Sequence, residues 1–230
     1  MLDVHPPEHA VHSWRDFFIH IATIVVGLII AVGLEQTVEW FHHRHQRHEL
    51  LEGINVDARK SIADSENVHR SCVSKLVWLD ARIAQVQQSL KTKQPLPASS
   101  HPATPDWDEP INPTWKAALN SQLVHVLSQE EIQAFSESND VLDTLQSLHW
   151  PMNNADQRIE VVEAKYGFRG TAAVQATPEQ LEQYLEALVD ARFKVANFDA
   201  WAEGAHGAET AILQGERDVD MVQKAERNKW

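Results

Sequence analysis

The chain has 230 residues, and its 33 acidic side chains outnumber its 20 basic ones, which gives a formal net charge of -13 with histidine neutral. That charge excludes nucleic-acid binding, because phosphates require a basic face on the protein. The single cysteine, Cys72, excludes a disulfide within the chain. Glycine is scarce, and the composition outside the N-terminal region favours helix formers, so an all-α fold is predicted.

Composition along the chain divides it into three predicted parts. A leader over 1–12 contains prolines and histidines with little to bury, and we expect it to be disordered. A transmembrane helix is predicted over 13–41. A helical bundle follows over 42–226, and it contains a proline-rich loop at 94–113 that cannot continue a helix.

The predicted transmembrane helix centres on the segment from Phe17 to Leu34, which contains no acid, Lys, Arg, Asn, Gln or Pro. Its length is about that of a bilayer's hydrocarbon core. Trp14 and Trp40 flank it about 39 Å apart, which matches aromatic side chains in the two headgroup layers. A secretory signal peptide is disfavoured, because it would have a basic leader and a cleavage site. A buried helix of a soluble protein is also disfavoured, because such a helix is seldom apolar on all faces.

Small residues recur along one side of this segment, at Thr23, Gly27 and Ala31. Such a stripe lets a second helix approach closely, so self-association through the anchor is one hypothesis. The alternative is ordinary membrane-helix composition, in which glycine is common. The lipid bilayer, a homo-oligomer and an unidentified protein are therefore the expected partners.

Histidine and arginine crowd together directly after the apolar segment. We name this group the collar; its members are His42, His43, Arg44, His45, Arg47 and His48. Together with Trp14 and Trp40, the collar is predicted to lie at the membrane interface. The favoured interpretation is contact with lipid phosphates, with imidazoles that gain charge as the pH falls. The alternative is a metal site, because the spacing places His45, His48, Glu49 and Glu52 on one face of the helix, each within about one turn of the next.

A three- and four-residue spacing of small or apolar side chains continues from Leu51 to Leu90. It predicts that the transmembrane helix continues into a long stalk helix with one packing seam. The expected members are Leu51, Ile54, Ala58, Ser61, Ser65, Val68, Cys72, Leu76, Leu79, Ile83, Val86 and Leu90.

Three further helices are predicted from their start signals. Thr114 is expected to cap a short helix, and Ser128 with Glu131 forms a capping box for a long one. Thr177 followed by Pro178 marks the start of the last long helix. The long helices have matching seams, so we expect an antiparallel three-to-four-helix bundle.

Pro151 lies inside the helix that begins after Ser128. Because proline lacks a backbone N–H, it predicts either a kink near Leu148 or a break into two helices.

Two Glu-x-x-His pairs, Glu66 with His69 and Glu203 with His206, repeat the spacing that di-iron helical bundles use to place a carboxylate and an imidazole on one face. A metal site at these residues is a speculative hypothesis. The alternative is that they lie on solvated faces. No metal or other cofactor is otherwise predicted.

Signatures of common enzymes are missing: there is no phosphate-binding glycine loop, GxSxG, CxxC or HExxH. Cys72 falls on the seam, which favours a small buried side chain over a nucleophile. We therefore expect a non-enzymatic interaction or scaffold module. The alternatives are a pH or ligand sensor that uses the collar, and a metal-binding bundle.

The segments WRDFFIHIATIVVGLIIAVGLEQTVEWFHHRH and PTWKAALNSQLVHVLSQEEI resemble uncharacterised bacterial proteins with an N-terminal single-pass anchor and a helical soluble region. The resemblance implies an address in the bacterial inner membrane and says nothing about activity. Counting positive charges near the anchor gives a tie between its two sides. A large bundle can be translocated regardless of its charge, so the periplasmic side is the working expectation.

Overall fold

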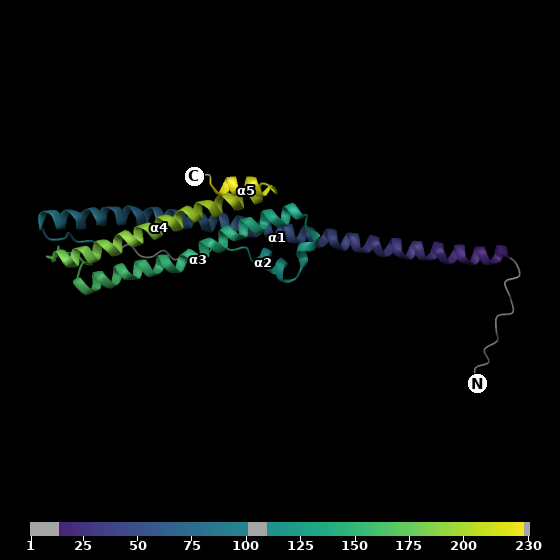
Figure 1. The fold of residues 1–230 in the computed structure, drawn as a ribbon, viewed down its shortest axis with the longest axis horizontal. Coiled ribbons are helices and arrows are strands. Elements are labelled where there is room, and N and C mark those ends of the chain that lie inside the picture. Colours follow the sequence, from purple (N-terminus) through teal and green to yellow (C-terminus); the bar gives the residue numbers. More distant parts are fainter. Residues whose placement is uncertain (1–13, 101–109, 228–230) are drawn as a thin grey trace, which may run out of the picture. The chain divides into compact units, whose positions relative to one another are not determined.

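The protein is described here by a computed structural model, in which residues 14–100 and 110–227 are described. These residues contain no strand, and the all-α prediction is confirmed. The helices are α1 (Trp14–Thr92), α2 (Pro113–Asn120), the 3-10 helix η1 (Leu123–Val126), α3 (Gln129–Tyr166), α4 (Pro178–Leu213) and α5 (Val219–Glu226), as Figure 1 shows. The predicted leader over 1–12 lies outside the described residues.

Helix α1 runs without interruption from Trp14 to Thr92, as the stalk prediction requires. The chain nevertheless divides into two compact units, one ending at Glu49 and the other beginning at Leu50. The sequence had suggested a domain boundary between residues 41 and 42. Because the residues just before Leu50 are largely exposed, they add little to the packing of the second unit.

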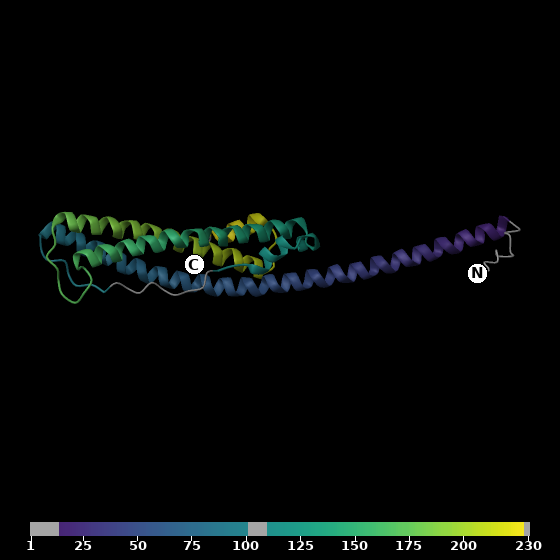
Figure 2. The ribbon, with the colours of Figure 1, turned by 90° about the horizontal axis from the view of Figure 1, so that it is seen from below.

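The second unit, which we call the helical unit, contains the part of α1 after Glu49 together with α2 to α5. In Figures 1 and 2, α3 and α4 lie side by side with this part of α1. His69 of α1 contacts Asp199 of α4, and Arg82, further along α1, contacts Tyr184, further back along α4. Contacts in this order require α1 and α4 to be antiparallel.

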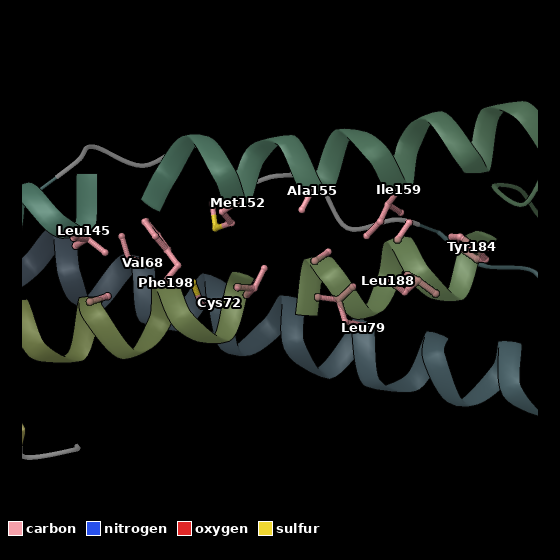
Figure 3. Close-up of a cluster of buried hydrophobic side chains, with 14 of the residues drawn as sticks. Val68, Cys72, Leu79, Leu145, Met152, Ala155, Ile159, Tyr184, Leu188 and Phe198 are labelled. Atoms are coloured by element: carbon pink, nitrogen blue, oxygen red, sulfur yellow. The ribbon is translucent and has the colours of Figure 1, made fainter. Parts of the chain in front are cut away.

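The core of the helical unit consists of two clusters of buried side chains. The larger one joins α1, α3 and α4. Figure 3 shows Val68 and Leu79 of α1, Leu145 and Met152 of α3, and Phe198 of α4 in the space between the three helices. The smaller one gathers around Trp115 and Phe135, whose ring centroids are 5.6 Å apart.

The starts of the two later long helices form as the sequence predicts. Ser128 accepts a hydrogen bond from the Glu131 amide, and the Glu131 side chain accepts one from the Ser128 amide. Thr177 and Gln180 make the same reciprocal pair at the start of α4. These bonds satisfy amides that the first helical turn leaves without partners.

Some local predictions differ from the structure. Asn112 caps α2 instead of Thr114, because its side chain accepts from the Trp115 amide. Of the two outcomes predicted at Pro151, a kink or a break, the break does not occur: α3 is one helix and packs into the core on both sides of Pro151 through Leu145 and Met152. Helix α5 was not expected, because its sequence is mainly charged and polar.

Two charged residues occupy the seam of α1 where Leu76 and Ile83 were expected. Lys75 and Arg82 are buried, whereas Leu76 and Ile83 are only partly buried. The Lys75 ammonium lies 2.5 Å from a carboxylate oxygen of Asp156 in α3. Burial is possible because each charge has a partner, which removes most of the desolvation penalty.

Arg82 is the centre of a buried hydrogen-bond network. Its Nε donates to the Tyr184 hydroxyl at 3.0 Å, and Tyr184 in turn donates to Glu163 at 2.5 Å. Its other nitrogens donate to the carbonyl oxygens of Pro97 and Phe168, at 2.8 and 3.2 Å. One guanidinium therefore joins α1, α4, α3 and both connecting segments.

The start of the proline-rich loop is paired with the segment between α3 and α4. Leu96 and Val174 exchange two backbone hydrogen bonds of 2.9 Å, and the Gly170 amide donates to the Ser99 carbonyl at 3.3 Å. The middle of that loop, residues 101–109, lies outside the described residues.

Candidate functional site

The apolar segment of α1 is exposed on every face. Leu28, Ile29 and Ile30 are consecutive, so they point in three different directions around the helix, and they are 60%, 66% and 57% exposed. Within the described residues, α1 is the one helix that is long and apolar enough to cross a membrane, and none of its most apolar window is buried. The described part of the chain therefore contains one candidate membrane span.

The predicted interface residues flank this span as exposed side chains. Trp14 is 76% exposed and Trp40 is 54% exposed. The Arg44 guanidinium lies over the Trp40 ring at 5.4 Å, a cation–π geometry. Such a pair presents both an aromatic ring and a positive charge, which suits a headgroup layer.

The collar is exposed at all its histidines and arginines, and within it the structure pairs His45 with Glu49, 3.2 Å apart. Among the described residues, one group of three His, Asp or Glu side chains has ligand atoms within 4.8 Å of one another, and that group lies elsewhere. The geometry thus offers no support for a metal at His45, His48, Glu49 and Glu52.

The small-residue stripe has open space beside it. A Cβ added at Gly27 would have no atom within 4 Å. The Thr23 hydroxyl donates to the Ile19 carbonyl oxygen at 2.9 Å, so its polar group is satisfied inside the helix. The stripe can therefore contact another apolar surface without burying an unsatisfied hydroxyl.

In the helical unit, α1 and α4 bring a histidine and two carboxylates together. Ligand atoms of His69, Asp199 and Glu203 all lie within 4.8 Å of one another. His69 Nδ1 is 2.9 Å from Asp199 Oδ1 and 3.8 Å from Glu203 Oε1. We call these three residues the histidine–carboxylate group.

A second pair adjoins this group on the same two helices. His206 Nε2 lies 3.7 Å from Glu66 Oε1, with side chains that are 23% and 42% exposed. All four residues of the two predicted Glu-x-x-His pairs thus engage in contacts across the α1–α4 interface. His69 of α1 meets Glu203 of α4, and Glu66 of α1 meets His206 of α4.

Partial burial shapes the electrostatics of this region. The side chains of His69, Asp199 and Glu203 are 25%, 14% and 17% exposed. Burial raises the pKa of Asp199 above its ordinary value, against the opposing effect of the hydrogen bond and charge of His69. Burial lowers the pKa of His206, and the charge of nearby His69 acts in the same direction.

Cys72 lies one turn after His69 but is not a member of the group. It is 5% exposed, and burial raises the pKa of its thiol to about 12. A thiol in that state is neither a nucleophile nor a metal ligand at neutral pH, since both roles require the thiolate.

Sequence reasoning missed Asp199, which makes the shortest contact with His69. The signal that could have found it is its position four residues before Glu203, which places both carboxylates on one face of α4. A search restricted to the Glu-x-x-His spacing does not include that position.

The chain was compared with protein-family models, with curated proteins and with solved structures, and none of them matches it. Residue roles therefore rest on the geometry described above.

Proposed function

We propose that the protein is a single-pass protein of the bacterial inner membrane whose helical bundle acts as a non-enzymatic interaction or scaffold module. The observation that supports the anchor is an apolar segment exposed around its whole circumference in a chain whose other helices have a core of their own. Each fully exposed Leu or Ile would cost roughly 1.5–3 kcal/mol in water relative to burial. A bilayer removes that cost without any protein partner.

The interior of the helical unit supports a structural role for its buried polar groups. Arg82, Tyr184 and Glu163 use their hydrogen bonds to hold helices and loops together, and Lys75 is paired with Asp156. A rigid body held in this way is suited to presenting its surface to another protein. We place it on the periplasmic side.

Self-association through Thr23, Gly27 and Ala31 is part of the proposal. The open space beside Gly27 and the internally bonded Thr23 hydroxyl support a close helix–helix contact in lipid. A dimer would then carry two helical units on neighbouring anchors, which is a common arrangement for a scaffold.

The anchor is tested by adding charge to it. Val26→Arg combined with Ile29→Arg places two guanidiniums near the centre of the span, at roughly 2.5–3.5 kcal/mol each on insertion scales. We expect the unmodified chain to stay with membranes after an alkaline carbonate wash and the double variant to leave them. The matched control is Val77→Arg, at a valine of the helical unit that is 67% exposed, and it should stay with the membranes.

A full-length chain that fractionates as a freely soluble protein without detergent would contradict the proposal. A reporter enzyme fused to the C-terminus and active on only one side of the membrane decides the side of the bundle.

A further inference from the structure

We propose that His69, Asp199 and Glu203 form a binding site for a divalent transition-metal ion of the Zn²⁺, Mn²⁺ and Fe²⁺ class, adjoined by Glu66 and His206. This site goes beyond the proposed scaffold role and does not depend on it. One imidazole and two carboxylates are a donor set of borderline hardness, which suits these ions.

The distances within the group fit a shared ion. Metal–nitrogen and metal–oxygen bonds of about 2.0–2.2 Å place neighbouring tetrahedral ligand atoms roughly 3.4 Å apart. His69 Nδ1 lies 2.9 Å from one carboxylate and 3.8 Å from the other, on either side of that value. The two carboxylate ligand atoms lie within 4.8 Å of each other, so side-chain rotations would bring the three ligand atoms around one centre.

The ligands are placed by rigid, well-packed elements. Val68 and Phe198, the residues just before His69 and Asp199, are both fully buried and meet in the same core, as Figure 3 shows. Packing of these neighbours fixes the height of His69 relative to Asp199. Glu203 follows one turn later on the same face of α4, so its height is fixed as well.

The charge of the region also favours a cation. Two carboxylates converge on one imidazole nitrogen, and a third carboxylate, that of Glu66, lies beside His206. A protonated His69 offers a single N–H at Nδ1, which can form one good hydrogen bond and leaves the second carboxylate at 3.8 Å. A divalent ion would neutralise both carboxylates at once.

His206 and Glu66 can supply the further ligand that the histidine–carboxylate group lacks. His206 Nε2 and Glu66 Oε1 are 3.7 Å apart and both are partly exposed. Either can complete the coordination directly or through a water molecule, and the other can orient a ligand through a hydrogen bond. A partly open site of this kind is accessible to ions from solution.

Metal-stripped full-length protein in detergent micelles can be titrated with Co²⁺ at pH 7, and Zn²⁺ can then be added as a competitor. We expect one saturable site with visible absorption stronger than that of aqueous Co²⁺, and loss of this absorption on adding Zn²⁺. Asp199→Asn and His69→Ala should each weaken Co²⁺ binding at least tenfold, and Glu66→Gln should weaken it by roughly 10-fold or less.

Two controls separate this site from other histidines. A variant with His42, His43, His45 and His48 all changed to Gln removes the collar and should retain the absorption. Asp80→Asn removes a carboxylate from a separate α1–α4 ion pair, which it forms with Arg192, and should bind Co²⁺ like the unmodified chain.

The proposal is overturned if Asp199→Asn, folded by circular dichroism, binds Co²⁺ as tightly as the unmodified chain. It is equally overturned if binding disappears with the collar or if no saturable binding is found. In those cases His69 and Asp199 form a structural ion pair only.

Discussion

The two halves of α1 differ in which side chains they expose and which they bury. Between residues 17 and 34 the helix is apolar all round, and its Leu, Ile and Val side chains are exposed. After Leu50 only one side is buried, and that side includes serines, Lys75 and Arg82. The more apolar half is thus the more exposed one, and the buried seam of the other half is partly polar.

This contrast shows that the hydrophobicity of a helix segment does not by itself predict its burial within the protein, because the surroundings of the two segments differ. An apolar helix without protein contacts is stable where lipid surrounds it. A helix in the core of a domain that is surrounded by water can bury a charged side chain if partners from other helices satisfy its hydrogen-bond donors. The contrast predicts that mutations in the two halves disturb different properties.

The largest effect is expected at Arg82. Arg82→Ala removes the donor shared by Tyr184, Pro97 and Phe168 and leaves these acceptors without its hydrogen bonds, which should cost roughly 3–5 kcal/mol of unfolding free energy. The measurement is guanidinium chloride unfolding of the detergent-solubilised chain followed by circular dichroism. Arg192→Ala, in an exposed ion pair with Asp80 at the same interface, is the control and should have a much smaller effect. Equal effects would show that the seam is not held by buried charge.

The next effect concerns Glu209, which is fully buried and accepts a hydrogen bond from Ser138 at 2.9 Å. Burial, with a smaller contribution from the charge of Asp57, raises its pKa from 4.5 to about 7. The folded state therefore keeps a proton that the unfolded state releases, and this carboxyl lowers the stability as the pH rises from 4.5 to 7.

Glu209→Gln removes this titration and provides an amide oxygen that can still accept the hydrogen bond from Ser138. The unfolding free energy of the unmodified chain should fall relative to that of the variant by about 1.4 kcal/mol per pH unit within that window. Using the difference between the two proteins cancels other groups, such as Glu226, whose pKa burial also raises to about 7. Glu182→Gln, at an exposed position on α4, should run parallel to the unmodified chain. A parallel curve for Glu209→Gln would refute the assignment.

The smallest effects compare glycines in the two units. A Cβ at Gly207 would lie 2.2 Å from the Ala225 carbonyl oxygen, so Gly207→Ala should displace α5, at roughly 1–3 kcal/mol. Amide hydrogen exchange over residues 219–226 should then be faster. A Cβ at Gly27 would have no atom within 4 Å, so Gly27→Leu should leave that exchange unchanged.

Gly27→Leu should instead reduce cross-linked dimer in membranes, because the larger side chain separates the stripe from its partner. Unchanged cross-linking would remove the stripe from the proposed function. Faster exchange over residues 219–226 in this variant would show that the two units are more closely coupled than their separate packing implies.

The sequence by itself predicted the long helices and the exposed apolar segment of α1. Ser128 and Thr177 fix two helix starts through contacts within three residues, and the apolar segment from Phe17 to Leu34 needs no distant residue to be recognised. Such features depend on local hydrogen bonds and on side-chain periodicity, which a single sequence displays directly. Even the four residues of the two Glu-x-x-His pairs could be named from their spacing.

Only the tertiary structure decided which partners these residues meet. Arg82 and Lys75 enter the core because Tyr184, Glu163 and Asp156 arrive from helices far away in the sequence. Asp199 joins His69 for the same reason, across 130 residues of chain. Whether a polar side chain is buried depends on the free energy of its pairing, and the pairing is set by how the helices align.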